Sequence, residues 1–199
     1  MAATVRLTRT DDAPTLDDVL ADALFDDPIN VYLVPDEARR GAALRRGMGH
    51  VLRQQYLPND AAWTTEDLSG VALWAKPDDP KPSVLGQLRQ LPAFASAFGR
   101  HLPRAMRAFG TVEKHLPPEP HWVLDLLAVR PDRQGQGIGS ALVTAGLAEA
   151  GRMGVPAFLV TSKRRNVPFF EHAGFDVIEE FEIGPVGVWA MLHAAAPAA

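Results

Sequence analysis

The chain carries the glycine-rich segment Val129-Arg-Pro-Asp-Arg-Gln134-Gly-Gln-Gly137-Ile-Gly139-Ser140. Before it lies an apolar run, Trp122 to Val129, which is typical of a buried strand, and after it lies a helix-like segment, Ala141 to Met153. A glycine-rich turn between a strand and a helix leaves backbone N–H groups exposed at the positive end of the helix dipole. The segment therefore predicts a site for phosphate oxygens.

Several readings compete for this segment, including a plain turn without a ligand. A mononucleotide P-loop needs Gly-Lys-Ser/Thr, which the chain lacks. A dinucleotide-binding loop needs Gly-x-Gly-x-x-Gly, but counting from Gly135 the third glycine is replaced by Ser140, and no acid follows about 20 residues later. The remaining pattern, Gln134-x-x-Gly137-x-Gly139, is complete.

That pattern resembles the Arg/Gln-x-x-Gly-x-Gly/Ala loop of the GCN5-related N-acetyltransferases, the GNAT family, in which it binds the pyrophosphate of coenzyme A. A second motif, Asn166 to Phe175, is similar to the family's Asn followed by a short helix that ends in Gly-Phe. The spacing between the two motifs leaves room for one helix and one strand. The resemblance implies an acetyltransferase that uses acetyl-CoA.

Within the family, the chain looks most like puromycin N-acetyltransferase and its actinobacterial relatives. The similarity lies in Gly154-Val-Pro-Ala-Phe-Leu, in Arg165-Asn-x-Pro-Phe and in the Gly-Phe turn that follows. It is dense from about His121 to Phe175 and thin from Pro77 to Pro120. Because the thin part covers the region that lines the acceptor pocket in this group, the amine acceptor and a role in antibiotic resistance stay undetermined.

Length and composition favour one globular domain. The 199 residues are 47% hydrophobic, enough for a single core, so we expect one domain over 1–194 and a disordered tail over 195–199. A net charge of −4 argues against a nucleic-acid partner, and the lack of a long apolar run argues against a membrane span. The N-terminus lacks the apolar core of a signal peptide, which predicts a cytoplasmic protein, either monomer or homodimer.

The chain contains no cysteine, and its six histidines lie far apart. Disulfides and a cysteinyl acyl-enzyme are therefore excluded, and no metal site is expected.

Hydrophobic periodicity and turn residues predict an α/β (α+β) fold. The strands are expected at 4–8, 63–65, 71–76, 121–129, 157–161, 175–183 and 186–193. The helices are expected at about 11–24, 36–52, 137–153 and 166–173, and over 84–114 with breaks near Pro92 and Pro103. This order predicts a mixed, mainly antiparallel twisted sheet of six to seven strands with helices on both faces. The resemblance implies that the central parallel strands, 121–129 and 157–161, splay apart.

The resemblance also implies how acetyl-CoA is held. The loop amides bind the pyrophosphate, and the pantetheine arm lies beside strand 121–129 like an added strand. Asn166 reaches the arm from the other side, or else only caps the helix that follows it. The cofactor-binding residues are then Leu127, Ala128, Val129, Gln134, Gly135, Gln136, Gly137, Ile138, Gly139, Ser140, Asn166, Phe169 and Phe170.

The expected reaction is direct attack of an amine on the thioester in a ternary complex. Asp125 is an acid in an otherwise apolar strand, where we expect it to be half-buried, and burial raises the pKa of a carboxyl group. It is the first candidate for the base that deprotonates the amine, although it could also only bond a neighbouring strand or arginine. His121, at the start of the same strand, is the second candidate, and a surface histidine is the alternative.

Many relatives have a Tyr general acid where this chain has Phe170, which has no proton to donate. Water could reprotonate the thiolate of coenzyme A, because the pKa of a thiol is only about 8.5. Tyr32 is a further candidate, since the 25–34 loop approaches the acceptor pocket in this fold. The missing acid also leaves open a second function, a catalytically weak acyl-CoA-binding protein that acts as a sensor or complex partner.

Overall fold

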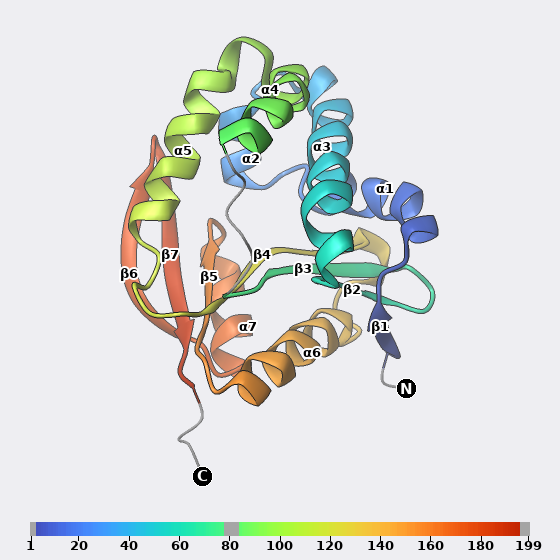
Figure 1. The fold of residues 1–199 in the computed structure, drawn as a ribbon, viewed down its shortest axis with the longest axis vertical. Coiled ribbons are helices and arrows are strands. Elements are labelled where there is room, and N and C mark those ends of the chain that lie inside the picture. Colours follow the sequence, from blue (N-terminus) through green and yellow to red (C-terminus); the bar gives the residue numbers. More distant parts are fainter. Residues whose placement is uncertain (1–2, 78–83, 196–199) are drawn as a thin grey trace.

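The computed structural model describes residues 3–77 and 84–195, with the backbone alone for residues 84–90. Most of the tail expected over 195–199 therefore lies outside the described residues. One sheet of seven strands, in the order β1-β2-β3-β4-β5-β7-β6, forms the centre of the fold (Figure 1). Strands β4 and β5 are parallel, and the other neighbours are antiparallel. The predicted fold class is confirmed.

The strands begin and end close to their predicted limits. They are β1 Val5–Leu7, β2 Ala62–Thr65, β3 Gly70–Ala75, β4 Trp122–Val129, β5 Ala157–Thr161, β6 Asp176–Ile183 and β7 Val186–His193. The helices are α1 Ala13–Ala23, α2 Pro28–Leu33, α3 Glu37–Val51, α4 Val84–Phe98, α5 Leu102–Lys114, α6 Ile138–Met153 and α7 Val167–His172. A π-helical turn, Leu52–Tyr56, continues α3.

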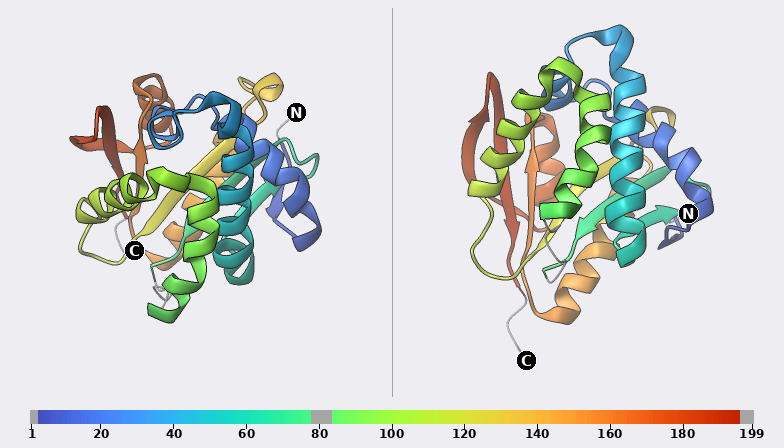
Figure 2. Two further views of the ribbon diagram at one scale, coloured as in Figure 1. Left: turned by 90° about the horizontal axis from the view of Figure 1, so that it is seen from above. Right: turned by 45° about the horizontal axis from the view of Figure 1, so that its top comes forward.

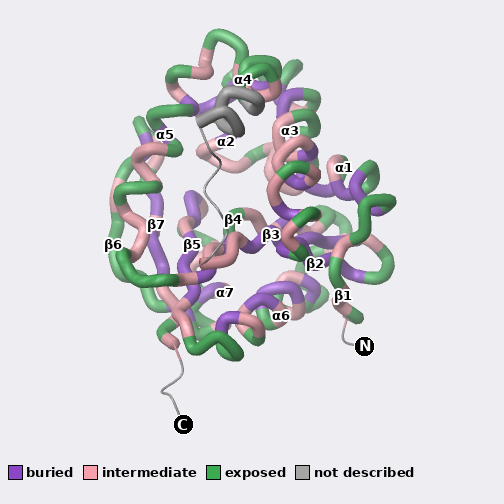
Figure 3. Tube along the Cα trace, viewed as in Figure 1, coloured by how far each residue is buried: buried purple, intermediate pink, exposed green. Residues whose placement is uncertain are grey.

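Helices cover both faces of the sheet (Figures 1 and 2). On one face α6 and α7 bury an aromatic core that contains Trp74, Trp122 and Phe175. On the other face α1 and the π-helical turn after α3 cover a second core with Leu16 and Leu52. Figure 3 shows the buried residues concentrated along the inner sides of these helices and along the central strands.

Helix α6 lies unusually close to the sheet at Gly146. A Cβ atom built on Gly146 would lie 2.1 Å from Cε2 of Trp74, whose side chain is fully buried. Only glycine leaves room for the indole at this point, so the close packing of α6 against β3 depends on Gly146. This contact fixes the height of α6 above the sheet, and with it the position of the helix N-terminus.

Strand β4 carries a β-bulge at Asp125, which changes the direction of its backbone groups. Its pairing with β3 passes from Trp74↔Leu124 to Leu73↔Leu126, so Asp125 is the extra residue. Because a bulge adds one residue to one strand, the alternation of N–H groups is shifted beyond it.

The parallel pair β4–β5 separates at the same place. Its register runs from Trp122↔Ala157 to Leu124↔Leu159 and ends there, although both strands continue. Beyond Leu124 the edge of β4 that faces β5 is therefore not part of a ladder. The expectation of splayed central strands is confirmed.

Two expectations about helices were wrong. The expected loop 25–34 contains α2, because Asp27 accepts a hydrogen bond from the N–H of Ile29 (3.0 Å) and Pro28 occupies the first helical turn. Helix α4 continues through Pro92 and ends at Phe98, whereas the break near Pro103 is confirmed. The cost of an internal proline is offset by packing beyond it, where Phe94 and Phe98 contact each other.

Helices α4 and α5 are inserted between β3 and β4 and form a roof over the splayed strands (Figure 2). The end of this roof is fixed to β6: the ring of His115 stacks on Phe181 at 3.8 Å between centroids, and its Nδ1 lies 2.8 Å from Oε2 of Glu179. Arg104 of α5 donates to the carbonyl of Tyr32 in α2 (2.7 Å). The roof is thus tied to both the sheet and α2.

Candidate active site

A cavity of about 1180 Å³ lies between the splayed strands and the roof. It is lined by five of the residues singled out in the sequence, namely His121, Asp125, Leu127, Asn166 and Phe170. These residues come from β4, from the start of α7 and from the segment before β4. The structure therefore brings together the candidate bases and part of the candidate coenzyme site.

The loop that follows β4 presents unbonded amides. Among the described residues, the backbone N–H groups from Gln134 to Ser140 donate to no protein acceptor, and the first such bond of α6 is from Ala141 to the carbonyl of Gly137 (3.0 Å). Gly135 and Gly137 have φ angles of +74° and +79°, which turn these amides outward. The exposed loop at the start of α6 has the donors and the dipole that an anion such as a diphosphate needs.

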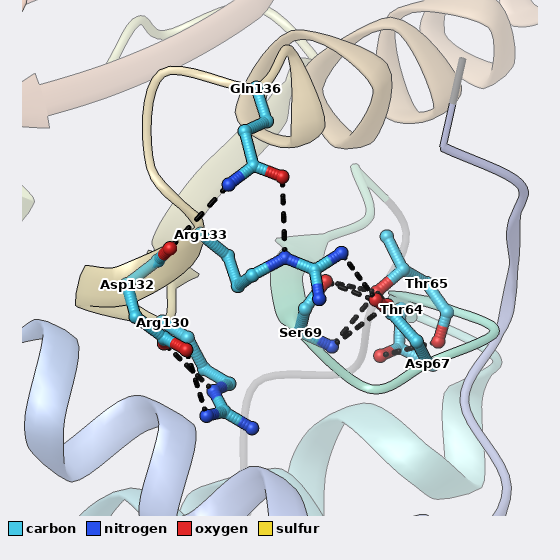
Figure 4. Close-up of polar contacts among 8 residues, drawn as sticks. All are labelled: Thr64, Thr65, Asp67, Ser69, Arg130, Asp132, Arg133 and Gln136. Carbon is cyan, nitrogen blue, oxygen red and sulfur yellow. Dashed lines mark hydrogen bonds and ion pairs between the residues drawn. The ribbon is translucent and has the colours of Figure 1, made fainter. Parts of the chain in front are cut away.

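Side chains on both sides hold this loop in place (Figure 4). Gln134 closes it against the end of β4, since its side-chain amide donates to the carbonyl of Val129 (3.1 Å). The guanidinium of Arg133 contacts Oε1 of Gln136 (3.3 Å) and the carboxylate of Asp67 in the β2–β3 turn (3.0 Å). The loop is therefore anchored to β4 and to the neighbouring turn before any ligand is present.

Asp67 is the fixed end of this network. Hydrogen bonds from Ser69 (2.7 Å) and Thr65 (2.7 Å), helped by the charge of Arg133, lower the pKa of its carboxyl group to about 2. It is therefore ionised throughout the neutral range and pairs with Arg133. Nothing in the sequence pattern pointed to Asp67, because its partner lies 66 residues away.

The cations near the loop are already paired. Arg130 contacts Asp132 (3.1 Å), as Arg133 contacts Asp67. The charges of these two arginines are thus partly neutralised, so the backbone amides are the main donors to an anion here.

The edge of β4 beside the gap carries two further donors. Trp122 donates its N–H toward β5, to Pro156 (2.9 Å), whereas Arg130 donates toward β3, to Ser69 (2.9 Å). Trp122 and Arg130 are eight residues apart, so their N–H groups would point to the same edge of a regular strand. They point to opposite edges here because the bulge at Asp125 adds one residue between them. N–H groups point alternately to the two edges of a strand. Because that of Arg130 points toward β3, that of Ala128 also points toward β3, whereas those of Val129 and Leu127 point to the gap between β4 and β5.

The opposite side of the gap is formed by α7. Asn166 precedes this helix, but its side chain makes no capping hydrogen bond and lines the cavity instead. Phe169 packs against the start of α6, within 3.3 Å of a Cβ built on Gly139. Phe170 is buried in the core and lines the floor of the cavity.

Asp125 is hydrogen-bonded to a tyrosine that the sequence did not reveal. The hydroxyl of Tyr56, a buried residue of the π-helical turn, donates to Oδ2 of Asp125. Asp125 itself is exposed to the cavity, so the expectation of a half-buried carboxylate was wrong. The reason is the bulge: it places Asp125 at the opening between β4 and β5 and not between packed faces.

The other two candidate catalytic residues lie in different surroundings. The Nδ1 atom of His121 is 2.6 Å from the carbonyl of Glu119, and its ring contacts Phe158 edge-on at the cavity wall. Tyr32 does not line the cavity: a Cβ on Gly184 would lie 2.5 Å from its hydroxyl oxygen, and Arg104 covers its ring. The structure thus places His121 and Asp125 on the wall of the same cavity and Tyr32 outside it.

The structure also bears on two other features, metal-binding clusters and membrane-spanning helices. In the part of the chain that the structure describes, no group of three or more His, Asp or Glu side chains is arranged to hold a metal ion. No helix in the described ranges has the length and apolarity needed to cross a bilayer.

Comparison with known proteins gives a consistent result. Residues 61–175 match the model of the acetyltransferase (GNAT) family. A crystal structure described as histone acetyltransferase HPA2 and related acetyltransferase from Corynebacterium glutamicum is similar, with 26% identity, a TM-score of 0.77, and coverage of 100% of this chain and 99% of that one.

Two more distant structures share the fold. A mosquito arylalkylamine N-acetyltransferase like 5b has 14% identity and a TM-score of 0.59, with coverage of 96% of this chain and 99% of that one. A chain of the NatC complex bound to Gag peptide and CoA has 12% identity and a TM-score of 0.56, with coverage of 98% and 100%.

Proposed function

This chain belongs to the GNAT family of acetyltransferases, and we propose that it transfers the acetyl group of acetyl-CoA to a primary amine of a small molecule. The proposal rests on one observation: three features follow one another in order along β4 and the loop after it. Asp125 lies in the cavity, unpaired N–H groups follow at Leu127 and Val129, and the unbonded amides of the loop come next. A ligand with a thioester, an amide-bearing arm and a diphosphate has its parts in the same order.

Acetyl-CoA supplies an activated acetyl carbonyl. The loop amides from Gly135 to Ser140 bind the diphosphate, with the dipole of α6 behind them. The N–H groups of Leu127 and Val129 would bond the arm as a neighbouring strand does, and Asn166, which precedes α7, would bond it from the other side. With acetyl-CoA bound, an N–H of this edge would face the thioester oxygen and would stabilise the negative charge that develops there during attack.

The amine must lose a proton before it can attack, and Asp125 is the proposed base. Its carboxylate lines the cavity, and the hydroxyl of Tyr56 donates to one of its oxygens and so fixes its orientation. Tyr56 is therefore a positioning residue. His121 is retained as the second candidate base, since it lines the same cavity.

Water is the proposed source of the proton that the departing thiolate regains. Phe170 has none to give, Tyr32 lies outside the cavity, and the hydroxyl of Tyr56 is engaged by Asp125. A thiolate is a good enough leaving group for this, because the pKa of a thiol is only about 8.5.

The resemblance to the puromycin N-acetyltransferase group and a cytoplasmic location remain part of the proposal. The remote structures named for arylalkylamine or peptide acceptors are under 25% identical and support only the fold.

The test measures thiol release from acetyl-CoA with a thiol reagent over a panel of amines. We expect turnover with at least one small primary amine, and a loss of turnover in Asp125→Asn that is larger than the loss in His121→Gln. The weak acyl-CoA-binding alternative is favoured by Phe170. It would be supported by tight acetyl-CoA binding, seen as a thermal shift, with no turnover of any amine.

A further inference from the structure

The roof of the cavity carries a cluster of three phenylalanines. Phe94 and Phe98 of α4 and Phe109 of α5 contact one another, with ring centroids 5.9–6.2 Å apart. All three line the cavity. Phe109 keeps 43% of its surface exposed, although it sits among other rings. Because these rings line the cavity and Phe109 keeps much of its surface exposed, the cluster has apolar surface that a further apolar group can cover.

The charges around the same cavity have one predominant sign. Among the described residues that line it, four are acids and one is a lysine; the acids are Asp27, Glu113, Glu119 and Asp125. Asp27 is engaged in the fold, since it caps α2 and accepts a hydrogen bond from Ser162 (2.7 Å). Asp26 and Asp36, two further acids close to α2 in the sequence, do not line the cavity. An acidic balance beside an aromatic wall suits a cation with an apolar body.

The position of the two features sets the orientation of such a ligand. Asp125 lies on the sheet side, at the gap where β4 and β5 separate, and the phenylalanines lie on the roof. An ammonium group directed to Asp125 therefore leaves the rest of the molecule facing α4 and α5. Flat rings gain from such a wall beyond the area that they bury, because they pack offset or edge-on against other rings.

We propose that the acceptor is a small primary amine with an aromatic body, whose ring is held by Phe94, Phe98 and Phe109 while its amine meets Asp125. The inference rests on the proposed function and narrows its substrate class. The aromatic wall favours such an amine over two alternatives. A polyamine has no ring to pack against the phenylalanines and could gain only cation–π contacts, and the aliphatic stem of a lysine in a peptide covers less of them than a ring does.

The experiment compares 2-phenylethylamine with ethylamine, spermidine and a lysine-containing peptide. We expect kcat/KM for 2-phenylethylamine to exceed that for ethylamine at least tenfold, because a buried phenyl ring removes roughly 100 Å² of apolar surface from water. Phe109→Ala should reduce this ratio severalfold. The matched control is Met106→Ala, which alters another exposed apolar residue of α5 that does not line the cavity and should leave the ratio unchanged.

A binding measurement separates this inference from the proposed function. Calorimetric titration of the protein with each amine, in the presence of coenzyme A, should show the same order of affinity as kcat/KM. Binding of 2-phenylethylamine without turnover would support the inference and overturn the proposed reaction. Turnover or binding that favours ethylamine, spermidine or the peptide, or an unchanged ratio in Phe109→Ala, would overturn the inference and leave acetyl transfer intact.

Discussion

The charge of a side chain placed at Gly137 should control the affinity for coenzyme A. Gly137 precedes α6 with a φ of +79°, and a Cβ built on it meets no atom within 4 Å. A longer side chain would therefore extend into the space above the loop amides. Gly137→Glu places a negative charge there, and Gly137→Gln places a neutral side chain of the same size.

The two variants should lose stability for the same backbone reason. A side chain in the left-handed region costs about 1–2 kcal/mol. For a chain of this length each kcal/mol lowers Tm by roughly 2–4 °C. Thermal unfolding without ligand measures this cost, which should be smaller for Gly137→Glu by about 0.3–1 kcal/mol, because the helix dipole favours a negative charge at the start of α6.

Their affinities for coenzyme A should differ. At a separation of about 5 Å, one negative charge and a doubly charged diphosphate repel by about 1.7 kcal/mol even at the dielectric constant of water. Since about 1.4 kcal/mol corresponds to a tenfold change, Gly137→Glu should bind coenzyme A at least tenfold more weakly than Gly137→Gln. The difference should shrink as salt is added. Equal Kd values for the two variants by calorimetry would refute the assignment of the loop.

Three further perturbations follow from the contacts described above. Tyr56→Phe removes the hydrogen bond to the β4 carboxylate, which is worth about 1.5–3 kcal/mol to a charged acceptor, so Tm should fall by roughly 3–12 °C. The protein that remains folded at the assay temperature should still lose about tenfold or more in kcat/KM, because the carboxylate is no longer oriented; an unchanged kcat/KM would leave Tyr56 only a packing role. Asp67→Asn should lower the free energy of unfolding near neutral pH. The difference in unfolding free energy between wild type and variant should be smaller at about pH 3, because the pKa of Asp67 is low in the folded state and its protonation removes the stabilisation as pH falls. A difference measured by urea unfolding that stays constant with pH would count against this pairing. Gly146→Ala drives a methyl group into the indole of Trp74 and should cost about 1–3 kcal/mol in chemical denaturation, and a neutral result would show that α6 can shift freely.

The parts of the fold that depend on local pattern were predictable from the sequence. The loop 134–140 combines glycine spacing with a strand before it and a helix after it, and the structure places it between β4 and α6. Strand limits were also close, because alternation and turn residues act over a few positions. The resemblance, not the pattern, supplied the splayed strands.

The parts that depend on distant contacts were not predictable. Tyr56 and Asp125 are 69 residues apart, and neither residue signals the other. The bulge at Asp125 is visible in the sequence only as a shift in which apolar residues share a face, with Leu124 and Leu127 on the same side. Such a shift cannot be recognised before the partner strand is known. The same holds for α4, where packing among phenylalanines overrides the local effect of Pro92.

The central claim is that free backbone amides after β4 hold the diphosphate of coenzyme A. Titration of isotope-labelled protein with coenzyme A, followed by backbone amide NMR, measures these groups directly. The account predicts that the largest shifts fall on residues 135–140 and extend to Leu127 and Val129. Saturable binding of coenzyme A that leaves the amides of 135–140 unperturbed would contradict it.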